Sequence, residues 1–182
     1  SQSEIRNYLP KVFSDGFVDD EKAEIDETVE ATLREAEFQF VNGNYSAVEA
    51  LAENAFLRKK FVFPFVYEHS LYTMLFERYL DDMGRKPSQA EAALAKFSAW
   101  HGANPHSGFA AAVHARALHS AGYAYRGTSD ARNVTAEGWK QLKLYEQSAL
   151  DLYKQSSIDH SGHWYWRQSY FDIAITDFRG EA

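Results

Sequence analysis

Cysteine is absent from this sequence of 182 residues, which excludes a disulfide framework, a cysteine nucleophile and every thiolate metal site. Long apolar runs are absent as well: those present, such as residues 61–67, are far shorter than the ~18 residues that span a bilayer. Lysine and arginine form no extended cluster of the kind that displaces counterions from nucleic acid. We therefore expect neither membrane insertion nor nucleic-acid binding.

Sequence signatures of catalysis and of targeting are also missing. No Gly-x-Ser-x-Gly segment marks a nucleophilic serine, and no glycine-rich run opens a helix to hold phosphate. The chain begins at Ser1 without a basic segment, an apolar stretch and a small-residue cleavage site. We expect no cofactor, we assign no catalytic residue, and we expect a cytoplasmic location, with a secreted mature form as the alternative.

Aromatic and acidic residues are prominent instead. Phenylalanine, tyrosine and tryptophan make up 15% of the chain, which favours a core built from large rings. Residues 19–37 hold nine acidic side chains against two basic ones, so this segment accounts for the whole net charge of −7. A solvated helix face is the usual interpretation of such a segment. The alternative is a docking face for a basic partner, formed by Glu27, Glu30, Glu35 and Glu37.

Apolar residues recur at helical spacing through nearly the whole chain, and strand-like alternation is missing. We therefore predict an all-α fold of about seven helices, paired as antiparallel hairpins because their connecting loops are short. Residues 1–21 form an N-terminal extension in this prediction, and residues 22–182 form the hairpins of a single helical domain. The expected helices span residues 25–40, 46–59, 64–83, 88–100, 107–126, 135–157 and 164–178.

Several helix ends and buried faces are marked by individual residues. Ser88, with Glu91 three positions later, predicts a capping box at the start of the fourth helix. Gly127 predicts the end of the alanine-rich fifth helix, and Thr135 predicts the N-cap of the sixth. The expected buried face of the first helix holds Ile25, Val29, Leu33, Ala36 and Phe40. The expected buried face of the last helix holds Trp164, Phe171, Ile175 and Phe178.

The segment Gly43-Asn44-Tyr45-Ser46-Ala47-Val48, followed by Ala55, resembles the turn and second helix of a tetratricopeptide repeat. That family places Gly-x-Tyr-x-x-Ala at a tight helix–turn–helix, with a small residue seven positions later. Val48 stands where alanine is usual, and the first helix lacks the Trp-x-x-Leu-Gly signature. The resemblance covers one hairpin of about 35 residues, and it implies a tetratricopeptide-like array of closely packed hairpins.

A second resemblance covers roughly residues 113–174. These segments are similar to the C-terminal half of an uncharacterised bacterial family of helical proteins, a domain of unknown function. The resemblance implies a tetratricopeptide-like fold and supplies no activity. It rests on Ala115-Arg116-Ala117, Gly122-Tyr123-Ala124, Arg126-Gly127 and Val134 to Trp139, with Leu150, Trp164 and Phe171 after them.

Histidine pairs are the candidates for a metal site. His160 and His163, beside Asp159, have a spacing that binds zinc when further ligands arrive from elsewhere. The sequence identifies no further ligand, so a polar loop or helix cap is the preferred interpretation and we predict no metal. Among the other histidines, His114 and His119 are five apart and do not share a helix face, and His101 and His106 flank a loop.

A cluster of polar and aromatic residues surrounds the junction of the fifth and sixth helices. Arginine and tryptophan often anchor protein interfaces, so the cluster predicts a groove that binds a partner or a ligand. A stacked arginine is also consistent with a structural clamp on the loop at 127–134. The predicted groove residues are His114, Tyr123, Arg126, Trp139, Trp164 and Trp166.

These patterns favour a non-catalytic module that binds a protein or peptide, with the acidic first helix suited to a basic partner. The alternative is a small helical enzyme or ligand-binding protein, in which His114, Tyr123 and Arg126 converge on an anionic substrate. A third interpretation is that the chain is part of a longer solenoid, in which case the terminal helix would expose aromatic residues such as Tyr165 or Tyr170.

Overall fold

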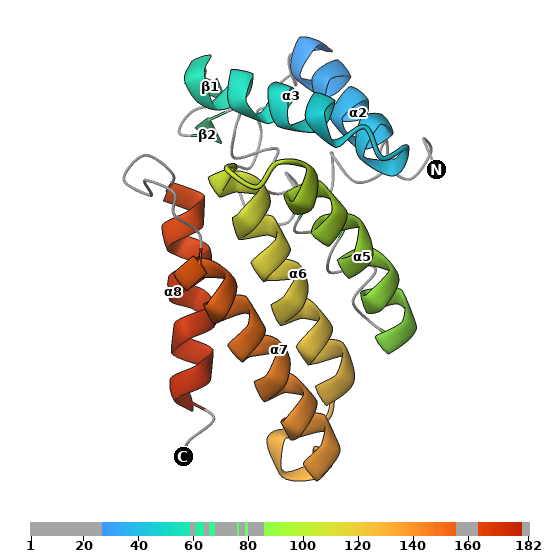
Figure 1. Cartoon of the computed structure of the whole chain (residues 1–182), viewed down its shortest axis with the longest axis vertical. Helices are drawn as coiled ribbons and strands as arrows, with labels where there is room; N and C mark the ends of the chain where they lie inside the picture. Colours follow the sequence, from blue (N-terminus) through green and yellow to red (C-terminus); the bar gives the residue numbers. More distant parts are fainter. Residues whose placement is uncertain are drawn as a thin grey trace, which may run out of the picture.

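The computed structural model describes residues 27–58, 61–63, 66–67, 76, 79, 86–155 and 164–179, and at 27–30, 56–58, 61–63, 66–67, 164–165 and 176–179 it describes the backbone alone. Over these residues the chain is all-α, with six helices packed largely antiparallel, which confirms the predicted fold class (Figure 1). No helix in these ranges is long and apolar enough to cross a bilayer. The helices are α2 (Glu27–Val41), α3 (Tyr45–Arg58), α5 (Pro87–Ala103), α6 (Gly108–Arg126), α7 (Ala136–Gln155) and α8 (Trp164–Arg179).

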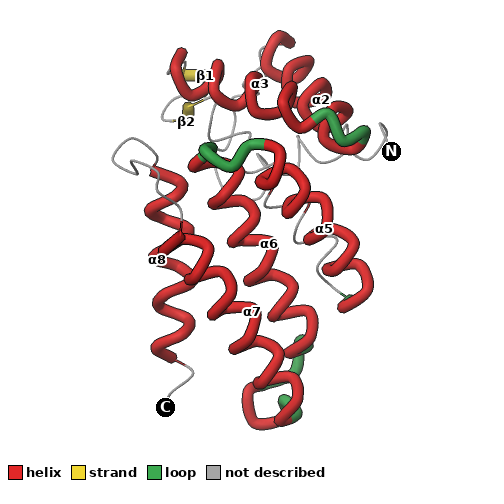
Figure 2. The backbone as a smooth tube through the Cα atoms, in the orientation of Figure 1, coloured by secondary structure: helices red, strands yellow, loops and turns green. Residues whose placement is uncertain are grey.

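A short antiparallel ladder interrupts the helical pattern, where β1 (Phe61–Phe63) pairs with β2 (Val66–Tyr67) (Figure 2). The sequence predicts a helix from residue 64, so β2 contradicts the start of that helix. Both strands consist of aromatic and β-branched residues, which favour extended backbone, and runs this short show no period. Farther along the predicted helix only Phe76 and Tyr79 are described, and both are helical.

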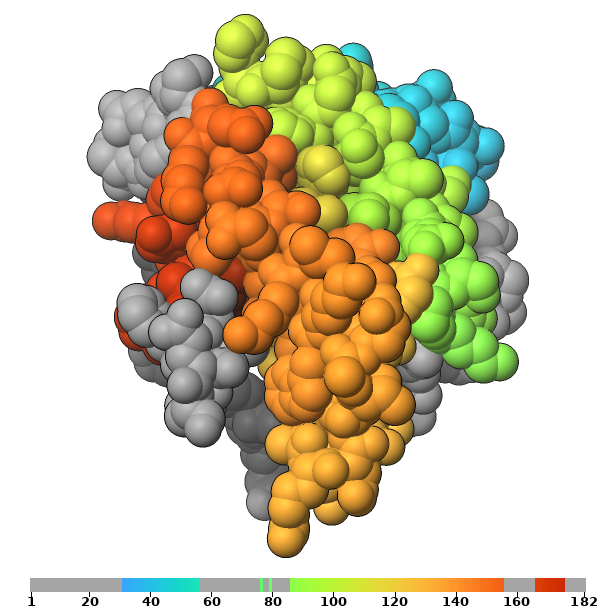
Figure 3. Space-filling view, turned by 60° about the horizontal axis from the view of Figure 1, so that its bottom comes forward, coloured from blue at the N-terminus to red at the C-terminus, as the bar shows by residue number. Residues whose placement is uncertain are grey.

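The described helices form two layers. In the larger layer α5, α6, α7 and α8 alternate in direction, with α7 and α8 packed against each other and both against α6, while α2 and α3 lie across the end where α5 turns into α6 (Figure 1). α6 is the central helix, because it packs against α5, α7 and α8. Figure 3 shows the same relation from another side: α7 and α5 occupy most of the face, and little of α6 is visible between them.

The sequence of α6 explains its central position. Its alanines are buried over most of the helix, and their small side chains allow neighbouring helices to approach, as the sequence predicts. The closest approach is at Gly122, where a Cβ atom would lie 3.1 Å from Leu142 Cδ1 and 3.3 Å from Leu142 Cα of α7. At this point glycine is the residue that fits between the two helices.

The predicted end of α6 and the predicted N-cap of α7 are confirmed. Gly127 closes α6 with a φ of +80°. Ser107, expected as the first residue of this helix, is its N-cap, since its Oγ accepts a hydrogen bond from Ala110 N at 2.9 Å. Thr135 Oγ1 accepts a hydrogen bond from Gly138 N at 3.0 Å and thereby caps α7.

The predicted capping box at the start of α5 is wrong. α5 begins at Pro87, after Lys86, and no side chain caps it. Proline at the first helical position has its φ already fixed for the helix and needs no hydrogen-bond acceptor, so it starts α5 without a cap. Glu91 instead accepts a hydrogen bond from the hydroxyl of Tyr125 at the far end of α6.

Aromatic rings join the two layers. Phe40 lies on the buried face of α2 that the sequence predicts, and its ring centroid is 4.9 Å from Phe97 and 5.8 Å from Trp100 of α5. Phe76 lies 5.2 Å from Phe40 and 4.9 Å from Trp100. Phe40, Phe76, Phe97 and Trp100 are each at most 1% exposed, so the centre of the core is aromatic.

The predicted buried face of α8 is wrong in part. Phe171 is 59% exposed, while Ser169 and Ile173 are buried. Aromatic residues occupy several sides of α8, so their spacing does not identify the inner side. The packing selects a face on which Ser169 Oγ accepts a hydrogen bond from the hydroxyl of Tyr153 at 2.7 Å, which satisfies both buried groups.

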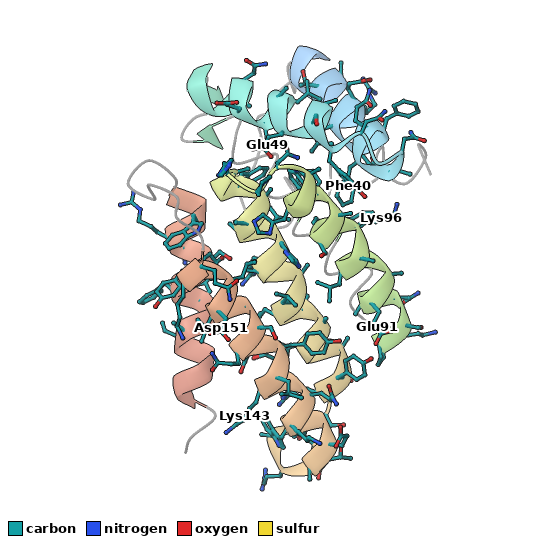
Figure 4. The ribbon with its side chains drawn as sticks, viewed as in Figure 1. Phe40, Glu49, Glu91, Lys96, Lys143 and Asp151 are labelled. Carbon is teal, nitrogen blue, oxygen red and sulfur yellow. The ribbon has the colours of Figure 1, made fainter. Side chains whose placement is uncertain are left out.

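A half-buried carboxylate also connects the layers. Glu49 of α3 accepts a hydrogen bond from Trp100 Nε1 at 3.1 Å and a second from the hydroxyl of Ser107, the N-cap of α6. Burial raises the pKa of Glu49 above its ordinary value, and the two hydrogen bonds oppose part of that increase. Figure 4 shows Glu49 between α3 and the ends of α5 and α6, close to Phe40.

Replacing Glu49 tests this connection. In Glu49→Ala the indole of Trp100 and the hydroxyl of Ser107 both lose their acceptor, which costs about 1–3 kcal/mol for each buried polar group left unsatisfied. Glu49→Gln is the matched control, because its amide has the same shape and can donate and accept hydrogen bonds. Urea unfolding should show a clear loss of unfolding free energy for Glu49→Ala and a smaller one for Glu49→Gln. Equal stability of the two variants would mean that these hydrogen bonds do not hold the layers together.

Candidate functional site

The predicted groove residues lie in three separate places. His114 is near the start of α6, Tyr123 and Arg126 are at its end beside Trp139 of α7, and Trp166 is in the first turn of α8. His114 and Tyr123 are nine residues apart on one helix, which puts them about 13 Å apart along its axis and on opposite sides. Trp164 lies in α8, where its side chain is not among those described. The structure therefore does not bring these side chains into one groove, and His114 does not converge with Tyr123 and Arg126 as the enzyme hypothesis requires.

Arg126 forms the first of the three clusters. Its guanidinium carbon lies 4.9 Å from the ring centroid of Trp139 and 5.8 Å from that of Tyr123, and Nη1 donates a hydrogen bond to Gly127 O at 3.1 Å. Gly138 lets the chain approach closely here, because a Cβ atom at that position would lie 3.3 Å from Arg126 Cα. The arginine thus stacks on the first turn of α7 and bonds the end of α6, which favours the clamp interpretation.

An acid–base pair, His119 with Glu146, lies about two turns of α6 before Arg126. His119 Nδ1 is 3.8 Å from Glu146 Oε1 of α7, and the two side chains are 13% and 3% exposed. Burial, followed by the nearby charge of Arg116, lowers the pKa of His119 to about 4. Glu146 lies within ion-pair distance of the imidazole but beyond hydrogen-bond distance, and burial outweighs the effect of its charge. His119 is therefore neutral at pH 7, and the enclosure of both groups keeps a substrate away from them.

The depressed pKa of His119 predicts acid sensitivity. In the unfolded chain His119 is protonated below its ordinary pKa of 6.5, whereas in the folded chain it stays neutral down to about pH 4. The unfolded state therefore binds more protons in this range, and the free energy of unfolding falls as the pH drops from 6.5 to 4. Glutamine does not titrate, so His119→Gln removes this difference in protonation between the folded and unfolded states. His106→Gln is the control, because His106 is an exposed histidine in a loop. Urea unfolding between pH 6.5 and 4 should show a shallower pH dependence for His119→Gln only. Parallel curves for wild type and His119→Gln would contradict the prediction.

The second cluster is a pair of histidines from two helices. His101 lies in the last turn of α5 and His114 in the second turn of α6, and their Nδ1 atoms are 3.3 Å apart. The ring centroids are 5.4 Å apart, and both side chains are half-buried. Burial lowers the pKa of both, that of His114 to about 4, with the neighbouring His101 as a second cause. Sequence spacing could not reveal this pair, because His101 and His114 are 13 positions apart and meet only through the α5–α6 turn.

The third cluster is an aromatic surface where α7 and α8 pack together. Trp166 lies 4.8 Å from Tyr153 in a perpendicular arrangement and is stacked on Tyr170 at 5.7 Å. Burial raises the pKa of Tyr153, whose hydroxyl is held by Ser169. Tyr170 is 40% exposed and Phe171 is 59% exposed. Exposed aromatics on the last described helix are what the solenoid interpretation expects, and Tyr165, the other residue considered for this role, has no described side chain.

The outer face of α2 carries exposed apolar residues as well as an acidic one. Phe38 is 59% exposed and Val41 is 50% exposed, and Glu35, one turn before Phe38, is exposed as well. Glu37 is half-buried on a different side, where its charge adds to burial in raising the pKa of Tyr79. Glu27 and Glu30 lie in the first turn of α2, with side chains outside the described set. Glu35 and Glu37 therefore lie on different sides of α2, and Glu35 accompanies an exposed phenylalanine.

Within the described ranges no cluster of three metal ligands is found, and the lining of a pocket at the α2–α3 turn is uncharged. No three histidine, aspartate or glutamate side chains gather there to hold a metal ion, and His160 and His163 lie outside these ranges. An open pocket at the α2–α3 turn is lined by uncharged groups, and its lining contains no carboxylate, imidazole or amine. Its lining residues are Gln39, Gly43, Asn44, Tyr45, Ser46, Ala47 and Ala103.

Comparisons with protein-family models, with curated proteins and with solved structures find no match to this chain. The tetratricopeptide-like array and the likeness to an uncharacterised bacterial family therefore stay predictions from the sequence.

Proposed function

We propose that the protein is a non-catalytic binding module, and that the outer face of α2, formed by Ala31, Glu35, Phe38 and Val41, docks a basic segment of another protein that carries an apolar side chain. The observation that carries the proposal is the exposure of Phe38, 59% on a helix that belongs to the aromatic core through its other side. A large exposed ring can anchor an interface, and acidic residues around it favour a partner of positive charge.

The charge of α2 supports a basic occupant. The helix holds four glutamates and one arginine, and its last turn has no basic residue. The C-terminal end of a helix carries partial negative charge, which also favours a cation. Lys96 of α5 already supplies one, since its Nζ donates a hydrogen bond to Val41 O at 3.2 Å (Figure 4). A basic segment on the outer face would extend the same complementarity along the rest of α2.

A peptide-display selection tests the proposal. Immobilised full-length protein would select from a random peptide library at low salt, and the enriched peptides would be synthesised and titrated. We expect lysine and arginine around an aromatic or aliphatic residue, with affinity that falls as salt rises. Phe38→Ala and Glu35→Lys should each weaken binding about tenfold or more, which corresponds to about 1.4 kcal/mol.

Phe171→Ala is the matched control for that experiment. Phe171 is as exposed as Phe38 but lies on α8, so its removal should leave the affinity of the peptides unchanged. Peptides that bind Phe38→Ala as tightly as wild type, or a selection that enriches no basic sequences, would refute docking on α2.

A further inference from the structure

We infer that His101 and His114 form a site for a late first-row divalent cation such as Zn²⁺, held by the two Nδ1 atoms with water in the remaining positions. The first argument is distance. Zinc binds imidazole nitrogen at 2.0–2.1 Å, so two ligands of a tetrahedral ion lie about 3.3 Å apart. The separation of the two Nδ1 atoms in the structure is 3.3 Å. The inference does not depend on the function proposed for α2.

The contact between the two Nδ1 atoms favours a metal. It requires that at least one Nδ1 carries no hydrogen, which is the form of the imidazole nitrogen that binds a metal. Without metal, one Nδ1–H donates to the other Nδ1, because two neutral rings facing each other through Nδ1 need opposite tautomers. When a cation binds, that hydrogen moves to Nε2 of its own ring, and both Nδ1 lone pairs then point at the metal. No net proton is released.

The position of the pair favours a cation. His101 lies in the last turn of α5, where the C-terminal end of the helix carries partial negative charge. His114 is six residues into α6, beyond the first turn in which the opposite helix end acts. Both side chains are half-buried rather than fully enclosed, so we expect water to complete the coordination shell. Two imidazoles leave at least two positions to water, which makes the site more open than a structural zinc site with four protein ligands.

Calorimetric titration of the full chain with zinc chloride at pH 7.5 tests the site. We expect one zinc ion per chain, with affinity reduced at least tenfold in His101→Ala and in His114→Ala. His106→Ala is the matched control: His106 is exposed in the α5–α6 loop between the two ligands, and its loss should leave the affinity unchanged. No zinc uptake by the wild type, or wild-type affinity in both His101→Ala and His114→Ala, would overturn the proposal.

A second measurement keeps the test decisive if His114→Ala fails to fold. Nitrogen NMR of the wild type reads the Nδ1 and Nε2 resonances of each histidine directly. Zinc at one equivalent should shift the Nδ1 resonances of His101 and His114 together and leave that of His106 in place. Zinc that binds while the resonances of His101 and His114 stay unchanged would place the metal elsewhere and overturn the assignment.

Discussion

Phe40→Ala is expected to lower the free energy of unfolding by about 3–5 kcal/mol, the range for removing a fully buried phenylalanine. Phe40 is 1% exposed and contacts rings from α5 and from the helical residues Phe76 and Tyr79. Its removal leaves a cavity at the centre of the joint between the two layers. A loss of this size is a large part of the stability of a typical domain, so Phe40→Ala tests the core and not the docking surface.

Phe38→Ala is the matched control for this prediction. The two phenylalanines are two positions apart on α2, but Phe38 is 59% exposed, so its loss should change stability by no more than about 0.5 kcal/mol. Urea unfolding of both variants measures the difference. Similar losses for Phe38→Ala and Phe40→Ala would show that α2 does not pack through the face described here.

Gly122→Leu is expected to lower the free energy of unfolding by about 3 kcal/mol, at the upper end of the cost of overpacking a core. Even the single methyl of Gly122→Ala would lie 3.1 Å from Tyr145 Cβ and 3.3 Å from Leu142 Cα, atoms that cannot rotate away. This contact opposes the gain of about 1 kcal/mol that alanine usually brings inside a helix. We therefore expect Gly122→Ala to be mildly destabilising and Gly122→Leu to force α6 and α7 apart.

Gly102 provides the comparison for Gly122. It lies in the last turn of α5, is exposed, and has no atom within 4 Å of the position a Cβ would take. Gly102→Ala and Gly102→Leu should leave stability unchanged or raise it by a few tenths of a kcal/mol up to about 1 kcal/mol. Thermal unfolding of the four variants is the measurement. Equal behaviour of the two positions would contradict the close approach of α6 and α7.

The helices and their ends could be predicted where a local pattern determines them. The periodic stripe through Leu33, Ala36 and Phe40 is buried as expected, Gly127 ends α6, and Thr135 caps α7. Local patterns do not determine the face of a helix that is aromatic on several sides. For that reason Phe171 was expected inside and lies outside.

The candidate sites were harder to predict because they depend on tertiary contacts. The groove hypothesis grouped residues by type and by proximity in sequence, but His114 faces α5 and Trp166 packs on Tyr153, away from Arg126. The His101–His114 pair is created by the crossing of two helices, which no spacing rule contains. Phe38 lies outside the periodic stripe, so its exposure is consistent with the sequence, but spacing alone does not identify an exposed ring as a docking residue.

The most direct test of docking on α2 is amide hydrogen exchange of the full chain with and without a selected basic peptide. The proposal predicts slower exchange in residues 31–42 when the peptide is bound, with residues 166–175 of α8 unchanged. Slower exchange confined to α8, where Tyr170 and Phe171 are exposed, would contradict it and move the binding surface to the aromatic end of the protein.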